Sequence, residues 1–283
     1  MKTRHFRFIL LVTALGCVSG PDLTYPTPPA PPPPSPGPAP SPSPIADVRL
    51  SDMVVSSLPT PFYRFEYDSS GRVTVAAFAG GLLTYEIRYD GSRITAMQGT
   101  LFPGERLDYS YDGTGKATMV TYADGSGAVY VRVHLAYSGD RLVKLERERF
   151  IEGRFLPDKR MSFVYDASGN LSELTDERLP FPGQTEATFV DRFEGYDTGI
   201  NVDGFSLLHN EFFDHLVLLP SVRLQVGNPA VVTRSGSGQN YRIAYTYAYD
   251  SEKRPLTKHG DGTFLSGAAS GSRFDTNATF SYQ

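Results

Sequence analysis

The chain has little of the residue types from which enzymes and metal sites are commonly built. Its 283 residues include one cysteine, five histidines and no tryptophan. A single cysteine cannot form an internal disulfide bond. The sequence has no Gly-x-Ser-x-Gly nucleophile elbow and no Asp-x-Asp-x-Asp-Gly calcium loop. We therefore expect no catalytic residue, no metal ligand and no cofactor.

Positive charge is also scarce beyond the first residues. Residues 1–16 carry three of the 27 Lys and Arg residues and none of the 31 acids, so the remaining chain has 24 basic residues, 31 acidic ones and a formal charge of −7. It offers no basic cluster that could neutralise phosphates. We therefore expect neither nucleic acid nor anionic lipid as a binding partner.

The N-terminus has the layout of a secretory signal peptide over residues 1–16. Lys2, Arg4 and Arg7 precede the apolar residues 8–15, a run too short to span a bilayer as a helix. The following Ala14-Leu15-Gly16-Cys17 resembles a bacterial lipobox, although the lipobox usually has the leucine and the small residue in the opposite order. The resemblance implies that Cys17 is lipidated. The alternative is a secreted protein in which Cys17 belongs to a discarded leader.

A proline-rich segment separates Cys17 from the rest of the chain. Twelve of the nineteen residues in 26–44 are proline, which excludes helix and sheet. We expect residues 17–44 to be a disordered tether, whose proline-rich part, residues 26–44, reaches roughly 60 Å in polyproline II conformation. Residues 45–283 then form one domain, held by Cys17 to a membrane of the bacterial cell envelope. Val18 after the cysteine favours the outer membrane, by resemblance to known lipoproteins.

The domain repeats an alternating aromatic strand, a Tyr-Asp pair and a small polar turn. In 63–67 and 83–89, apolar and charged residues alternate with the period of a strand that has one wet face. The repeat tyrosines Tyr67, Tyr89, Tyr111, Tyr137 and Tyr165 are 22 to 28 residues apart, which accommodates two strands per unit. The pattern predicts an all-β fold, a large curled antiparallel meander of fourteen to sixteen strands. Whether it closes into a barrel stays open.

The turn sequences favour a structural role for their aspartates. In Tyr67-Asp68-Ser69-Ser70-Gly71, the aspartate can accept backbone N–H groups, and the glycine can adopt positive φ. We therefore interpret these aspartates as turn residues rather than catalytic groups or metal ligands.

These units resemble the YD repeat of the RHS family. With the leader, they resemble a group of bacterial YD-repeat lipoproteins whose array is interrupted by a segment with a Tyr-Asp start and an Asn-Pro exit. Here these are Tyr196-Asp197 and Asn228-Pro229, and the likeness covers roughly residues 60–283. The resemblance implies a fold and supplies no catalytic residue.

The interruption also contains a helix candidate over 204–219. Asp203 is a plausible N-cap, Pro220 follows the last turn, and between them lie apolar residues at helical spacing: Phe205, Leu208, Phe212, Leu216 and Leu219. We expect this amphipathic helix to cover an open face or end of the sheet.

The histidines do not form a convincing metal site. On that helix, His209 and His215 lie six residues apart, about 240° around the axis, which does not suit one zinc ion. We expect His134 on the wet face of a strand and His259 in a Gly/Asp turn. The Ser235-Gly236-Ser237-Gly238 stretch reads as a flexible hairpin rather than a nucleotide loop.

The leading functional hypothesis is a non-enzymatic, monomeric envelope lipoprotein that binds a glycan or a protein on its β surface. The rival is a carrier in which the meander encloses an apolar molecule. A weaker alternative is a glycoside hydrolase-like enzyme, because carboxylates could meet across strands. Tyrosines on a wet rim would favour the first hypothesis, and a dry cavity of several hundred Å³ the second.

Overall fold

A computed structural model describes residues 48–100, 104–202 and 217–283. The signal peptide, Cys17 and the tether lie outside these ranges, as do His209, His215 and most of the expected helix. The last expected helical residues, 217–219, are described and are not helical. Within the described ranges there is no helix long and apolar enough to cross a membrane.

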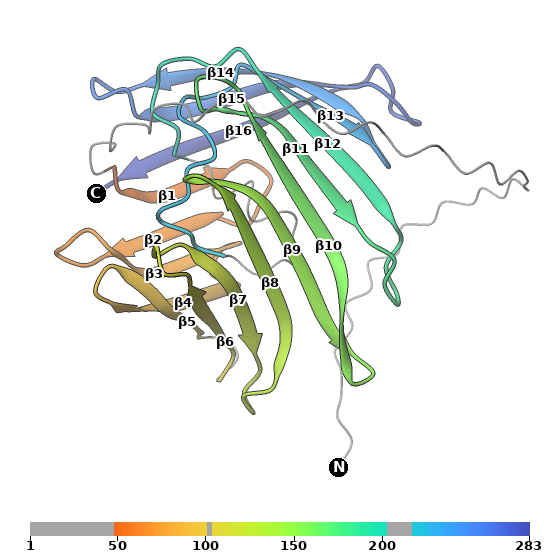
Figure 1. Ribbon diagram of the computed structural model, residues 1–283. Coiled ribbons are helices and arrows are strands. Elements are labelled where there is room, and N and C mark those ends of the chain that lie inside the picture. The colour runs from red at the N-terminus through yellow and green to blue at the C-terminus, as the bar shows by residue number, and fades with distance from the viewer. Residues whose placement is uncertain (1–47, 101–103, 203–216) are drawn as a thin grey trace, which may run out of the picture. The chain divides into compact units, whose positions relative to one another are not determined.

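The described residues form sixteen strands in one closed antiparallel barrel (Figure 1). Each strand pairs with its neighbours in the sequence, and β16 pairs with β1. The expected meander is therefore confirmed, and it closes. The strands are β1 (Leu50–Val55), β2 (Tyr63–Tyr67), β3 (Val73–Phe78), β4 (Leu83–Asp90), β5 (Arg93–Gly99), β6 (Arg106–Tyr111), β7 (Ala117–Ala123), β8 (Val129–Ser138), β9 (Arg141–Ile151), β10 (Arg154–Tyr165), β11 (Leu171–Arg178), β12 (Ala187–Glu194), β13 (Val231–Gly236), β14 (Tyr241–Tyr249), β15 (Pro255–Phe264) and β16 (Arg273–Tyr282).

A bulge recurs at each repeat tyrosine and gives a physical reason for closure. A β-bulge bends its strand and increases the local twist, so bulges at a regular place curl a sheet. The register of strand pairing shifts immediately before six tyrosines, Tyr67, Tyr89, Tyr111, Tyr137, Tyr165 and Tyr249. We call the turns that follow these six tyrosines the tyrosine turns.

The two-residue alternation sorts side chains between the inside and the outside of the barrel. On β2, Tyr63 and Phe65 are at most 1% exposed, whereas Arg64 and Glu66 are exposed. The same alternation continues on β8, where Val133 and Leu135 are buried. The apolar core therefore lies inside the barrel.

The two ends of the barrel differ. All six tyrosine turns lie at one end, the tyrosine end, together with the long connection from β12 to β13. The part of this connection in residues 217–230, here called the inner segment, runs through the middle of the barrel in Figure 1. Its Val217, Leu218, Leu219 and Leu224 are buried in the core. The opposite end carries the other set of hairpins, including β13–β14 and β15–β16.

Candidate functional site

The tyrosine turns are built as the sequence predicts. Asp68 Oδ1 accepts the backbone N–H groups of Ser70 at 2.8 Å and Arg72 at 3.0 Å, and Gly71 has a φ of 80°. The side-chain hydroxyl and backbone N–H of Thr114 donate to Asp112, and these bonds hold the pKa of Asp112 below its usual value. These aspartates thus stabilise turns.

The repeat tyrosines connect successive turns around the barrel. The Tyr89 hydroxyl donates to the Val73 carbonyl at 2.9 Å, and the Arg72 guanidinium lies 5.0 Å from the Tyr89 ring centroid. Burial raises the pKa of Tyr89 to about 12, so its hydroxyl stays a donor. The same cation–ring contact recurs at four other turns: Arg93–Tyr111, Lys116–Tyr137, Arg141–Tyr165 and Arg254–Tyr282. These tyrosines are therefore structural groups rather than a wet binding rim.

The inner segment closes the tyrosine end with hydrogen bonds to three parts of the barrel. The Tyr109 hydroxyl on β6 donates to the Leu218 carbonyl at 3.0 Å, and the Leu171 N–H on β11 donates to the Leu224 carbonyl at 3.0 Å. The Tyr247 hydroxyl on β14 donates to the Pro229 carbonyl at 3.0 Å. This end is therefore filled by the chain itself.

Asn170 and the two ends of the interruption hold this segment in place. Asn170 Oδ1 accepts the N–H groups of Val226 and Gly227 at 2.8 and 3.0 Å. Asp197 N–H donates to the Asn228 carbonyl, and Asn228 N–H donates to Asp197 Oδ1. The Tyr-Asp start and Asn-Pro exit noted in the sequence thus lie side by side.

A band of charged side chains faces the inside of the barrel on strands β9 to β13. Five are cationic and three are acidic, an excess of two positive charges. Three ion pairs at 2.6 to 3.7 Å are Arg149–Asp158, Lys159–Asp176 and Arg234–Asp191. They continue the inward face of strands whose other inward residues include the buried Leu145, Met161 and Leu174. The members are Arg147, Arg149, Asp158, Lys159, Asp176, Arg178, Asp191 and Arg234.

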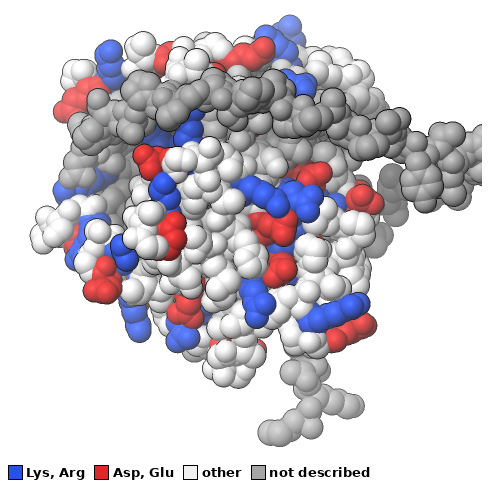
Figure 2. Space-filling model, viewed as in Figure 1, with Lys and Arg blue, Asp and Glu red and all other residues white. Residues whose placement is uncertain are grey.

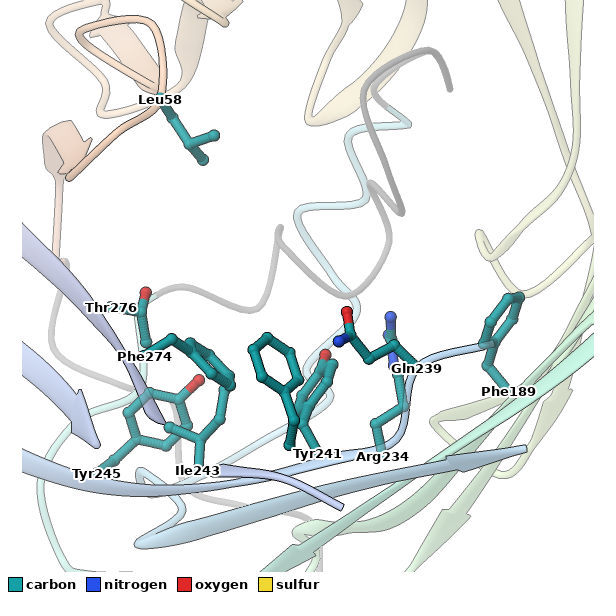
Figure 3. Close-up of a pocket in the computed structure, with 10 residues that line it drawn as sticks. Leu58, Phe189, Arg234, Gln239, Tyr241, Ile243, Tyr245, Phe274 and Thr276 are labelled. Carbon is teal, nitrogen blue, oxygen red and sulfur yellow. The ribbon is translucent and has the colours of Figure 1, made fainter. Parts of the chain in front are cut away.

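A pocket of about 640 Å³ lies at the end opposite the tyrosine turns (Figure 3). Most of its wall consists of apolar and aromatic side chains from β14–β16, and Leu58 comes from the far side. Ile243 is buried and Gln239 is exposed, so the pocket extends from the barrel interior to solvent. The lining residues are Leu58, Phe189, Arg234, Gln239, Tyr241, Ile243, Tyr245, Phe264, Phe274 and Thr276.

Two glycines of β15 allow the aromatic wall to lie flat against the strand. A Cβ at Gly262 would overlap the ring of Phe274, and a Cβ at Gly260 would overlap Tyr245 and Thr276. The Phe264 and Phe274 rings stack with centroids 4.5 Å apart. An aromatic ring above a strand glycine replaces the missing side-chain contact. The glycines therefore shape this wall of the pocket.

The pocket also has a polar edge at the β13–β14 hairpin. Arg234 donates from Nε and Nη2 to the two oxygens of Asp191, at 2.7 and 2.6 Å. Its guanidinium also lies 5.4 Å from the ring centroid of Tyr241, its cross-strand partner. Burial alone would lower the pKa of Arg234, but the hydrogen bonds and charge of Asp191 raise it overall. Arg234 is therefore a fixed cation beside the aromatic wall.

The histidines that the structure describes lie apart from this pocket and from each other. His134 is on the outer face as predicted, with Nε2 3.1 Å from Glu148. The prediction for His259 was wrong, since it lies within β15 and contacts Asn277 on β16. Gly260 and Gly262, which suggested a turn, instead accommodate aromatic rings within the strand. Across the described ranges, no group of three or more His, Cys, Asp or Glu residues could hold a metal.

Sequence reasoning missed the pocket residues. Arg234 falls on the inward side of β13, on the same face as Val232. Gly260 and Gly262 alternate along β15 opposite Tyr245 and Ile243. The signals that could have indicated a cavity are a charged residue and two glycines at inward-facing positions of the strands.

Comparisons with known proteins identify the fold class. No protein-family model and no curated protein matches the sequence. Among solved structures, a porin-like protein from Bacteroides uniformis is similar with a TM-score of 0.52 and 13% identity, over 78% of this chain and 89% of that one. At this identity the likeness shows an antiparallel β-barrel fold alone.

A second solved structure, TcdB2-TccC3, has a TM-score of 0.29 and 16% identity, over 77% of this chain and 10% of that one. The chain thus spans about a tenth of that protein. A TM-score this low carries no argument about fold or function.

Proposed function

We propose that this protein is a non-enzymatic lipoprotein of the bacterial cell envelope whose barrel binds an apolar small molecule. The pocket of about 640 Å³ with its aromatic wall carries the proposal, because its size and lining are those of a small-molecule site. This choice favours the carrier hypothesis over a glycan- or protein-binding surface. The repeat tyrosines support the same choice, since the hydroxyl groups of Tyr89 and Tyr111 bond to neighbouring strands rather than point to solvent.

The outer face of the barrel supports a location beside the membrane rather than within it. Outward ion pairs occur on several parts of the sheet, among them Arg64–Asp52, Arg160–Glu146 and Arg192–Glu173. Figure 2 shows acidic and basic side chains interspersed over the visible face. A membrane-spanning barrel instead presents an apolar band to lipid. In this proposal the lipid on Cys17 and the tether of residues 17–44 hold the barrel at the outer membrane.

The repeat structure supports membership in the YD-repeat lipoproteins. The Tyr-Asp units at Tyr67, Tyr111 and Tyr165 each correspond to one hairpin with a bulge at the tyrosine. The following cation contacts the tyrosine of a neighbouring turn. In this proposal the repeat is a device for closing a barrel, and the family resemblance concerns architecture.

The inward carboxylates support a binding function rather than glycoside hydrolysis. Asp158 is fully buried and pairs with Arg147 and Arg149 at 2.8 and 2.6 Å. Asp191 is held by Arg234. A hydrolase needs one carboxyl group as an acid and another as a base or nucleophile at the same substrate bond. Carboxylates fixed by arginines are suited to organising the barrel wall.

The proposed ligand binding is tested with the mature chain, residues 17–283, carrying Cys17→Ser so that no acyl group is added. Native mass spectrometry after purification should detect a stoichiometric apolar ligand, and the fluorescent probe N-phenyl-1-naphthylamine should bind and be displaced by it. Thr276→Trp should fill the pocket and abolish both signals. Thr279→Trp, on the outer face of the same strand, is the control and should retain them. Equal binding by both variants, or binding only to glycans or envelope proteins, would contradict the proposal.

A further inference from the structure

The polar edge of the pocket holds three hydrogen-bonding groups that the protein does not use. Nη1 of Arg234, the amide of Gln239 and the hydroxyl of Tyr241 make no hydrogen bond in the described part of the chain. Burial raises the pKa of Tyr241 to about 12, so this hydroxyl remains protonated and can donate. In Figure 3 the three side chains lie together beside the aromatic wall.

These groups are positioned by elements that are already fixed. Arg234 and Tyr241 are cross-strand partners on β13 and β14, and Gln239 lies in the hairpin between them. The bidentate bond from Asp191 orients the guanidinium and leaves its third nitrogen available. An arginine with one edge occupied can still donate from the other to a ligand. The site therefore offers two donors held on paired strands, Arg234 and Tyr241, and a third, Gln239, in the hairpin that joins them.

The surrounding charge also favours an anion at this edge. Asp191 pairs with Arg234, and a second guanidinium, that of Arg178, lies near the same part of the pocket. The guanidinium of Arg178 lies 5.1 Å from the centroid of the Phe189 ring, and that of Arg234 lies 5.6 Å from the same centroid. Phe189 itself lines the pocket. A carboxylate at this edge would lie beside the guanidinium groups of Arg234 and Arg178.

We propose that the pocket takes an apolar carboxylic acid, with the carboxylate bound by Arg234, Gln239 and Tyr241 and the apolar body against Ile243, Phe264 and Phe274. This inference rests on the proposed function and specifies its ligand. The stacked rings suit a flat aromatic body, and the length of the pocket toward Leu58 suits an alkyl chain. An aromatic acid and an alkyl acid would present the same carboxylate group to the polar edge.

Matched acids and esters test the inference. Decanoic acid and 2-naphthoic acid, each with its methyl ester, are titrated against the N-phenyl-1-naphthylamine complex of residues 17–283 with Cys17→Ser at pH 7.5. Each acid has nearly the shape of its methyl ester but also carries a negative charge. Because a charged acceptor forms stronger hydrogen bonds, the acid with the higher affinity should bind about tenfold or more tightly than its own ester. The acid that binds more tightly shows whether the pocket prefers an alkyl chain or an aromatic ring system.

Two variants assign the effect to the polar edge. Tyr241→Phe with Gln239→Leu removes two donors and keeps the aromatic ring, so the affinity for the acid should fall about tenfold while that for the ester stays unchanged. Asp191→Asn with Arg234→Gln replaces the ion pair without leaving a charge unpaired, and should remove the preference for the acid. Retention of N-phenyl-1-naphthylamine binding shows that each variant is folded.

The outcomes separate this inference from the proposed function. Equal affinities for acid and ester, or an acid preference that survives both variants, would overturn the carboxylate inference while the apolar pocket stands. Failure of the probe, the acids and the esters to bind at all would instead overturn the proposed function. A preference for the acid that is lost below the pKa of its own carboxyl group, about 4 to 5, would support the inference further.

Discussion

Replacing Asn170 with alanine should release the inner segment from the barrel. Asn170 is 7% exposed, and its Oδ1 accepts two backbone N–H groups, those of Val226 and Gly227. Alanine leaves both donors without an acceptor in a site that water reaches poorly. Each unsatisfied buried group costs about 1–3 kcal/mol, so the free energy of unfolding should fall by about 2–6 kcal/mol.

The matched control is Lys116→Ala. Lys116 follows Gly115 as Asn170 follows Gly169, at the same position of a tyrosine turn, but it contacts the Tyr137 ring and the Gly139 carbonyl near the surface. Its replacement should cost less than about 1 kcal/mol. Urea unfolding measures both variants, and amide hydrogen exchange at Val226 and Gly227 should accelerate only in Asn170→Ala. Equal stability losses, or unchanged exchange at these two amides, would refute the reasoning.

Three further predictions follow from the turns and the pocket. Tyr111→Phe removes the hydroxyl that donates to the Ile94 carbonyl at 2.8 Å and should lower the free energy of unfolding by about 0.5–1.5 kcal/mol in urea; a loss near zero would remove the connecting role of these tyrosines. Hydrogen bonds from Thr114 and Ser126 hold the pKa values of Asp112 and Asp124 below 3.8 in the folded state, so their stabilisation is present above the unfolded pKa of about 3.9 and is lost as the pH falls through the lower folded values. Thermal unfolding should therefore show a smaller loss of stability below about pH 4 for Asp112→Asn with Asp124→Asn than for the wild type, and parallel curves would contradict this assignment. Gly262→Ala should push the Phe274 ring into the pocket and weaken N-phenyl-1-naphthylamine binding, whereas the outward Asp261→Ala should leave it unchanged; equal effects would show that the ring does not form the wall.

Much of the architecture could be predicted from residue alternation and turn chemistry. Tyr63 and Phe65 face inward and Arg64 outward because a strand with one wet face needs that period. Asp68 and Gly71 form their turn for local reasons that a short sequence window contains. Such features depend on neighbours a few residues away, so the sequence displays them directly.

Closure and the pocket depend on distant contacts that no short window contains. Closure requires β1 to pair with β16, for example Met53 with Phe280. The repeat tyrosines mark the bulges that curl the sheet, but they do not show that its first and last strands meet. The Gly260 to Gly262 stretch has the composition of a turn, but its conformation is set by rings from β14 and β16. The ion pair between Arg234 and Asp191 likewise depends on the register of two strands 43 residues apart.

Photolabelling with an apolar diazirine probe tests the central claim, that the barrel binds an apolar molecule at the end opposite the tyrosine turns. The probe is bound to residues 17–283 with Cys17→Ser, activated, and located by peptide mass spectrometry. The account predicts adducts on the lining strands β14 and β16, around Tyr241 and Phe274, and their loss in Thr276→Trp but not in Thr279→Trp. Adducts confined to the outer face, or an unchanged pattern in Thr276→Trp, would contradict it.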